Sequence, residues 1–546
     1  SLVNLKQMPP PEGGFEFNIP DMILLNKEES MSAVEIKTQA VLVKGDTTEI
    51  NANNFKVNPD ATAEDLVGKM PGVSSSNGQI QAQGETVKKV LVDGKPFFGE
   101  DPNAALKNLP AEVVGKIQIY DAKSDQSLFS GIDDGNTTKT MNIITKSQFR
   151  NGLFGRGFAG IGQSIEGTGD QTKYKGGITI NSFKGIRRLT FLSQINNINE
   201  QNFSFEDLMG SAGGAGNRGG GMGGMGGNRG GMGGGSSFFT GSQSGITTTR
   251  AIGLNYSNQW GKNVELSGSY FLTSTANIKS TETNRNYIVG DISKGTLNYA
   301  ETNPSNTDNL SHRANFRLNW KLDSTNSLLF EPQISLQQNT SVNPLLANTI
   351  NGLGETISQL NNYTNSNTDG YRASSNILYR HSFKKKGRTF STEVNPGING
   401  QTGNTILTNS NQLLTTKTTR DQKTDLLKNT NTFSGNIVFT ESLDSNNFLA
   451  ATVSTNINQN NNDRLAYLKD AAALGYTRLD TFFSSKFVNG YSQHKVGISY
   501  RYQTYKWNMT TSLDGQLALL DGKQSMPKNS DIQTVHFPIA KFSSPI

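Results

Sequence analysis

The sequence contains no cysteine, and this absence excludes two kinds of chemistry. A thiolate metal site and a cysteine nucleophile both need the thiol group that the chain lacks. Histidine is scarce as well. The residues His312, His381, His494 and His536 are scattered, with no HExxH or Ser-His-Asp arrangement among them. We therefore expect neither enzymatic activity nor a bound cofactor or metal.

Long apolar runs are also missing. Only 34% of the residues are hydrophobic, and no run reaches the roughly 18 apolar residues of a membrane-spanning helix. The net charge of +6 is spread along the chain rather than clustered, so a nucleic-acid partner is not expected. The chain nevertheless has 28 Phe and 15 Tyr. A disordered chain has few aromatic residues, so we expect a folded protein with an unusually polar composition.

From Leu153 onwards, apolar residues recur with a period of two. Even positions from 314 to 322 are apolar, whereas the odd positions between them carry Arg, Asn and Lys. Residues 328–336 repeat the pattern. One apolar and one polar face is typical of a strand in an outer-membrane barrel. A water-soluble β-sandwich also alternates, but its turns recur every 8 to 12 residues or so, and here they do not.

Short polar connections interrupt this alternating region at regular intervals. They are Lys184-Gly185, Gly261–Asn263, Asp323–Asn326, Lys384–Gly387, Asp444–Asn447 and a turn near Tyr505. From the second onwards they recur about every 60 residues. Two strands of about a dozen residues each fill only part of such an interval, which leaves a long segment for a connecting loop. We therefore predict about 13 or 14 antiparallel strands, with short turns at one rim and long loops at the other.

The residues before this region have a different pattern. Residues 1–33, with three consecutive prolines, read as a linker or N-terminal extension. Residues 34–147 read as a small α/β module, and residues 148–546 as the barrel. In the module, Asp60 is the expected cap of a helix whose apolar residues face a core. A strand then leads into the Asp93-Gly94 turn.

Six pieces of the module carry a resemblance to a known family. They are KGDTTEINANNFK, DATAEDLVGKMPGV, VLVDGKPFFGEDP, KNLPAEVV, KSDQSLFSGIDDG and KTMNIITK. At this spacing the module resembles the plug of a Bacteroidota family of outer-membrane proteins in the TonB-dependent receptor superfamily. The resemblance implies a mainly β fold: a transmembrane antiparallel barrel of about 22 strands, with the α/β plug in its lumen. It also implies an outer-membrane location, a plug accessible from the periplasm and extracellular long loops.

The strand count falls short of this implied barrel. Because about eight strands are missing, we expect the full protein to continue past Ile546 by about 200 to 300 residues. No carboxypeptidase-like domain and no TonB box, the segment that couples such receptors to the inner-membrane machinery, can be read in residues 1–33.

Two functions remain open. The plug favours a protein that binds and imports a ligand across the outer membrane, with TonB or a surface lipoprotein as partner. The missing TonB box favours a non-transporting scaffold or accessory subunit of a larger outer-membrane complex for secretion, gliding or barrel assembly. Either protein would contact outer-membrane lipid.

Two groups of module residues are candidates for the functional site. We expect Asp125, Asp133, Asp134 and Lys139 to make plug–barrel contacts, since charged groups hold a plug in a polar lumen. The alternative for the acidic residues, together with Asp121, is a Ca²⁺ site. The second group is Phe97 and Phe98, which follow the Asp-Gly turn. They face a ligand at the plug tip, or they pack into the plug.

The longest predicted loop contains a glycine-rich stretch, Gly210–Gly235. Such a segment has little to bury, so we predict a flexible surface loop. Its longer side chains include Met222, Met225, Met232, Arg218 and Arg229. The methionines offer soft sulfur ligands, which makes Cu(I) binding the alternative function of this loop.

Overall fold

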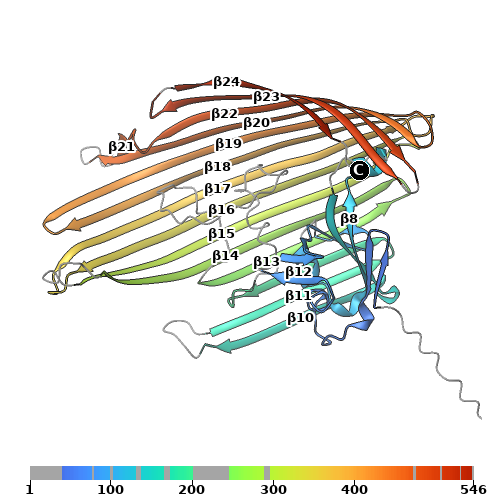
Figure 1. Cartoon of the computed structure of the whole chain (residues 1–546). Coiled ribbons are helices and arrows are strands. Elements are labelled where there is room, and N and C mark those ends of the chain that lie inside the picture. Colours follow the sequence, from blue (N-terminus) through green and yellow to red (C-terminus); the bar gives the residue numbers. More distant parts are fainter. Residues whose placement is uncertain are drawn as a thin grey trace, which may run out of the picture. The chain divides into compact units, whose positions relative to one another are not determined.

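A computed structural model describes most of the chain. The described residues are 40–76, 79–98, 102–130, 137–164, 172–200, 245–287, 296–470, 475–504, 507–528 and 530–543. Within them the protein is mainly β, as predicted, and three sheets are formed. Two small sheets and three short α-helices make up the α/β module, by which we mean β1 to β9 and the helices among them. The third sheet is much larger (Figure 1).

The main sheet of the α/β module has the order β1-β2-β8-β9-β6-β7. Only the β6–β9 pair is parallel. Its strands are β1 Val41–Lys44, β2 Thr47–Asn51, β6 Lys89–Val92, β7 Lys95–Pro96, β8 Val114–Lys123 and β9 Thr137–Thr145. The second sheet has β3 Val73–Ser76, β4 Gln79–Ala82 and β5 Glu85–Thr86. The predicted Asp93-Gly94 turn joins β6 to β7. Both of its residues have positive φ, 47° and 77°, as a type I′ hairpin turn requires.

Short helices connect these strands. The α-helices are α1 Ala63–Val67, α2 Pro102–Asn108 and α3 Asp125–Ser130, and the 3₁₀ turns are η2 Ala52–Asn54, η3 Ala111–Val113 and η4 Ser147–Phe149. The predicted cap of α1 was wrong by two residues. Thr62, not Asp60, is the N-cap, because it forms a reciprocal capping box with Asp65.

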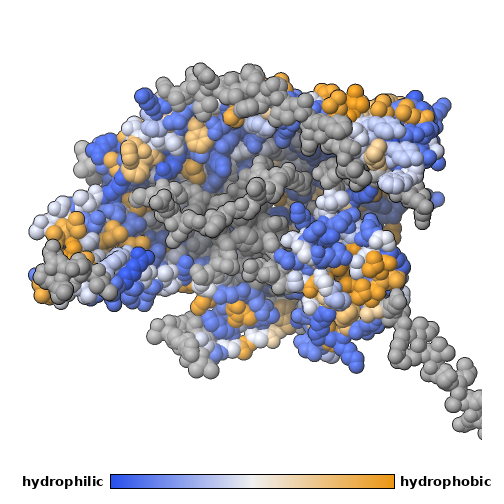
Figure 2. All heavy atoms as spheres, viewed as in Figure 1, coloured by the Kyte–Doolittle hydropathy of each residue, from blue (hydrophilic) through white to orange (hydrophobic). Residues whose placement is uncertain are grey.

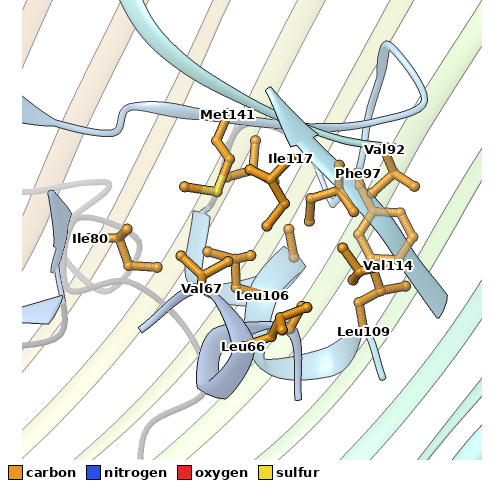
Figure 3. Packing of buried hydrophobic residues seen from close by; sticks show 14 of the residues in the cluster. Leu66, Val67, Ile80, Val92, Phe97, Leu106, Leu109, Val114, Ile117 and Met141 are labelled. Atoms are coloured by element: carbon orange, nitrogen blue, oxygen red, sulfur yellow. The ribbon is translucent and has the colours of Figure 1, made fainter. Parts of the chain in front are cut away.

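A single apolar core holds the module together. Leu66 and Val67 of α1 and Leu106 of α2 pack against Ile117 of β8 and Met141 of β9 (Figure 3), and each of these side chains is at most 2% exposed. The prediction that the apolar residues of this helix face a core is confirmed, because Leu66, Val67 and Met70 are at most 3% exposed. The core also includes side chains of the large sheet, which are described with the site below.

The large sheet is antiparallel throughout, and its strands follow one another in sequence order from β10 to β24. β21 lies beside this path and pairs only with β20. The strands are β10 Asn151–Gln163, β11 Thr172–Lys184, β12 Arg187–Asn196, β13 Ile246–Trp260, β14 Val264–Tyr287, β15 Leu297–Lys321, β16 Asn326–Ile350, β17 Thr356–Ser382, β18 Thr389–Leu413, β19 Thr416–Ser442, β20 Asn447–Asp470, β21 Gly475–Leu479, β22 Ser485–Gln503, β23 Asn508–Met526 and β24 Ser530–Ser543.

The two faces of this sheet differ as the alternation predicted. We call the face that contacts the module the inner face and the opposite one the outer face. On the outer face, Ile437, Val453 and Val496 lie side by side on three neighbouring strands and are 44%, 51% and 60% exposed. Figure 2 shows hydrophobic and hydrophilic residues interspersed over the face in its view.

The predicted short turns at described residues join neighbouring strands of the sheet, and Tyr505 of the remaining one lies outside the described residues. The long loops predicted at the opposite rim are partly wrong. Residues 351–355 suffice to join β16 to β17, and residues 414–415 join β18 to β19. The strands themselves are longer than predicted: β14 to β20 have between 24 and 27 residues each. The segments taken for loops are strands that carry polar residues on both faces, so the alternation that revealed the other strands is absent there.

In the described ranges, none of the helices has both the length and the apolar character that crossing a membrane would require.

Candidate functional site

The α/β module touches the inner face of the large sheet through two separate groups of residues. The hairpin β6–β7 and the two phenylalanines after it meet β12, β13 and β14; we call this contact the hairpin anchor. The helix α3 meets β15, β17 and β18; we call this contact the helix latch. The two contacts have different chemistry, which decides what each can do.

The polar part of the hairpin anchor is centred on Arg188 of β12. Its guanidinium donates to the Val92 carbonyl at 2.6 Å and to the Asp93 carboxylate at 2.5 Å. The same carboxylate accepts hydrogen bonds from the backbone and hydroxyl of Thr145. Arg188 is only 6% exposed and lies over the ring of Phe183. A buried, charge-assisted pair of this kind fixes the orientation of both partners.

The apolar part of the hairpin anchor is a stack of aromatic rings. Phe97 and Phe98 are each 1% exposed, and their ring centroids are 4.9 Å apart. Phe98 also contacts Phe271 of β14 at 4.9 Å, and its backbone amide donates to the Asn255 side chain at 3.0 Å. Gly253 leaves the space for this stack, since a Cβ atom there would lie 2.7 Å from the Phe271 ring.

The burial of Phe97 and Phe98 decides between the two alternatives for these residues. Rings with 1% exposure have no surface to offer a ligand, so the ligand-facing prediction is corrected in favour of packing. Their packing partner is the wall of the large sheet as well as the module itself. Next to them, burial lowers the pKa of the Lys95 amine, and the nearby Glu265 carboxylate opposes this shift.

The helix latch begins with an ion pair between Asp125 of α3 and Arg317 of β15, whose charged atoms are 3.2 Å apart. Arg317 also pairs with Glu331 of β16, which in turn accepts a hydrogen bond from Asn376 of β17. A second bond runs from Gln126 to the hydroxyl of Ser391 on β18. Four strands are therefore connected, directly or through Glu331, to one short helix.

The ion pair of the latch is more exposed to water than the ion pair of the hairpin anchor. The side chains of Asp125 and Arg317 are 35% and 24% exposed, against 14% for Asp93 and 7% for Arg188. The guanidinium of Arg380 lies 5.6 Å from the ring of Phe129 on α3 and adds a cation–π contact, of about 0.5–1 kcal/mol where water has access. Apart from the buried Gln126–Ser391 bond, the latch thus consists of polar and cationic contacts that water can replace.

A small cavity of about 50 Å³ lies between the two contacts. Among the described residues of the module, Pro96 of the hairpin is the one that lines it. The remaining lining residues come from four strands of the large sheet: Asn255, Ser267, Gly268, Asn315, Phe316, Arg317, Glu331 and Gln333. Most of these side chains are polar, and two of them belong to the latch network. The cavity is too small for anything but water or a small ion.

The predicted contact residues have different outcomes. Asp125 lies in the latch, against the wall of the large sheet. Lys139 instead pairs within the module, with Asp121 at 2.9 Å and with Glu85, because β9 and β8 place it opposite Asp121. Asp133 and Asp134 lie outside the described residues, as do Met222, Met225, Met232, Arg218 and Arg229. In the part of the chain that is described, no three His, Asp or Glu residues are grouped as metal ligands.

Sequence reasoning missed the wall side of both contacts. The sequence did not identify Arg188, Phe271 and Glu331 as contact residues. Strand alternation shows only that each lies on the same face as the residues two positions away. Arg317 was recognised as an inward-facing residue but not as a partner of Asp125. The alternation of apolar and polar residues shows which face of the sheet Arg317 occupies. Its partner Asp125 lies 192 residues away in the chain, so the local pattern does not reveal it.

The latch predicts a measurable change in permeability. Replacing Asp125 with asparagine removes the charge that Arg317 binds, while Glu331 remains. Since the pair is partly exposed, we expect a loss of about 1 kcal/mol, which raises the population of the released helix about fivefold. Single-channel recording in planar bilayers should show more frequent open events.

The matched control for this variant is Asp121→Asn, which removes a carboxylate that pairs inside the module. It should leave the conductance as in the unmodified protein. Equal conductance of the two variants would mean that the Asp125–Arg317 pair does not hold the helix.

Comparison with known proteins gives no assignment from sequence. No family model matches the chain, and no curated protein matches it. Among solved structures, the ferric yersiniabactin uptake receptor of Yersinia pestis is similar at 12% identity and a TM-score of 0.28, over 91% of this chain and 79% of that one. A siderophore receptor of Acinetobacter baumannii has 10% identity and a TM-score of 0.30, over 91% and 78%.

A third structure is the ferric-catecholate import receptor of E. coli K12 in an open form. It has 12% identity and a TM-score of 0.22, over 88% of this chain and 89% of that one. None of these three structures has a TM-score above 0.30 with this chain.

Proposed function

We propose that this protein is a plugged outer-membrane barrel that binds a ligand and imports it across the membrane. The observation that carries the proposal is the pair of contacts described above. A small α/β module is tied to the polar inner face of a sheet whose outer face exposes apolar side chains. Such a sheet suits a water-filled lumen on one side and lipid on the other, and the module is the plug of that lumen.

The tryptophans support a membrane location for the sheet. The chain has three, Trp260, Trp320 and Trp507, and all lie beside the short turns, 55%, 41% and 65% exposed. Membrane barrels carry a belt of aromatic residues where lipid meets water. The short-turn rim then marks one membrane surface. Because about 9 to 11 residues of a tilted strand cross the hydrocarbon layer, more than half of each long strand extends beyond the opposite surface.

The chemistry of the two contacts suggests how the lumen opens. Separating the hairpin anchor would expose two buried phenylalanines and a buried ion pair, which is costly. Separating the helix latch would replace partly exposed polar contacts with water, which costs little. The latch is therefore the part that releases, and the hairpin anchor holds the plug to the wall while α3 moves. We propose that TonB supplies the energy for this release, as the resemblance of the module implies.

A cysteine introduced into the latch tests this function without knowledge of the ligand. The chain has no other cysteine, and Gln126 is 6% exposed against β18. In the variant Gln126→Cys, a small thiol reagent should react only when α3 has left the wall. If transport is energised through the inner membrane, labelling in cells should fall severalfold when a protonophore collapses the proton gradient.

Thr416→Cys provides the matched control, because this residue is exposed beside a hairpin tip of the sheet. It should be labelled equally with and without the protonophore. A labelling rate at position 126 that ignores the proton gradient would contradict energised import. That outcome would favour the alternative of a non-transporting scaffold or accessory subunit.

A further inference from the structure

The turn between β17 and β18 is the most basic of the short turns. It contains Lys384, Lys385 and Lys386 in succession, followed by Gly387 and Arg388. All three lysines are exposed. Gly387 has φ of 82° and so closes the turn in a conformation that glycine adopts freely. The turn lies on the short-turn rim, where the tryptophan belt also lies.

Only part of this charge is neutralised by the protein. Glu441 of β19 pairs with Lys385 and accepts two hydrogen bonds from Arg388. Among the contacts of the described residues, no carboxylate pairs with Lys384 or Lys386. The turn therefore presents two ammonium groups to the solution, held on either side of a lysine that pairs with Glu441.

The wall directly beside the turn is aromatic and faces outwards. The ring of Phe383 contacts His381 at 4.5 Å and Phe439 at 6.2 Å, both edge to face. Phe383 and Phe439 are each 39% exposed on the outer face, and Phe390 lies between His381 and Phe439 in the register of the strands. An exposed aromatic patch of this kind matches the depth of the lipid interface, where acyl chains begin.

The neighbouring turns have the opposite character. Hydrogen bonds from Asn326 and Thr325 hold the pKa of the Asp323 carboxyl below its usual value. Hydrogen bonds from Asn446 and Asn447 lower the pKa of the Asp444 carboxyl in the same way. Both turns thus remain negatively charged and satisfy their own carboxylates. An anion arriving at this rim is repelled from both sides and attracted only to the lysine turn between them.

We propose that Lys384 and Lys386, with the aromatic patch of Phe383 and Phe439, bind the phosphodiester headgroup of an anionic phospholipid. The two ammonium groups bind the phosphate, and the part of the acyl chain next to the headgroup lies against the rings. This combination selects a lipid over free phosphate, because only a lipid uses both halves of the site. The inference rests on the membrane placement proposed above, since the headgroup must reach the short-turn rim.

The test compares lipid affinities of the full chain in detergent. Phosphatidylglycerol is titrated against the unmodified protein and the variant K384Q/K386Q, with bound lipid counted by native mass spectrometry. An exposed ion pair with the phosphate strengthens binding by up to about fivefold, so the double variant should lose affinity by up to about 25-fold. Phosphatidylcholine, which has no net charge, should bind both proteins equally weakly. An unchanged affinity for phosphatidylglycerol would overturn the proposal.

Four controls separate the possible reasons for failure. K384R/K386R keeps the charges and should retain the affinity, and K417Q removes an exposed lysine at the opposite end of the sheet and should have no effect. Inorganic phosphate at the same concentration should not displace the lipid; displacement would overturn the choice of a lipid. Flotation with vesicles tests membrane insertion itself: a protein that floats but does not prefer phosphatidylglycerol contradicts only the headgroup site, whereas one that does not float contradicts the proposed function.

Discussion

Replacing Phe98 with alanine is expected to release the α/β module from the wall far more often than any change at the latch. The ring is 1% exposed, and truncating a buried phenylalanine costs about 3–5 kcal/mol through lost burial and the cavity left behind. Part of this loss destabilises the fold of the module, and part of it weakens the contact of the module with Phe271. If half of it falls on the contact, the detached population rises about tenfold or more.

Conductance in planar bilayers and protease cleavage of the module both measure detachment. Phe98→Ala should raise each of them, while the heat-modifiable mobility of the sheet on a gel stays unchanged. Phe482→Ala is the matched control, because this ring is 83% exposed. A Phe98 variant that behaves like the Phe482 variant would show that the aromatic stack does not attach the module.

A double-mutant cycle isolates the contact across the boundary. Phe98→Ala and Phe271→Ala should cost less together than the sum of the single changes, by the roughly 0.5–1.5 kcal/mol of an aromatic pair. Strict additivity would mean that each ring acts only within its own sheet.

The second large effect is expected on the outer face of the sheet. Val453 is 51% exposed between Ile437 and Val496. It lies six residues from the Asp444–Asn447 turn. For a strand tilted at 45°, this places it about 14 Å below the membrane surface at that rim. That is close to the middle of a bilayer core of about 30 Å. An arginine at the midplane of a membrane barrel costs about 2–4 kcal/mol, so Val453→Arg should assemble poorly.

Asn456→Arg is the control on the same strand. This residue has the opposite parity, is exposed to the inner face, and stands between Ser434 and Gln493 in the register. It should be tolerated. The measurement is the fraction of protein with heat-modifiable mobility after refolding into vesicles. If both arginines were tolerated equally, the outer face would not contact lipid.

Much of the fold could be predicted because its signals are local. The Asp93-Gly94 hairpin, the core side of α1 and the short turns of the large sheet each follow from a few adjacent residues. The alternation in residues 314–322 also placed Arg317 on the inner face correctly. These features depend on local backbone preferences and on which face of a strand a residue occupies. Both are determined by residues that are adjacent in the sequence.

The site could be predicted only on one side. Asp125 was expected at a plug–wall contact, but its partner is 192 residues away and no pattern in the sequence joins the two. Phe97 and Phe98 were left between two alternatives because their burial depends on Phe271, which belongs to the wall. The distal halves of the long strands were taken for loops since Asn and Thr fill both of their faces, and alternation is then no guide.

The sequence separation of the two contacts sets an order of assembly. Strands of the large sheet pair with their neighbours in the chain, so the wall can grow one hairpin at a time from β10. The bond between Phe98 and Asn255 spans 157 residues, whereas that between Gln126 and Ser391 spans 265. The hairpin anchor can therefore form once β14 is in place, while the latch can begin with Arg317 of β15 and is complete only when β18 is in place. The later strands of the wall are therefore added while the module is already attached to the earlier ones.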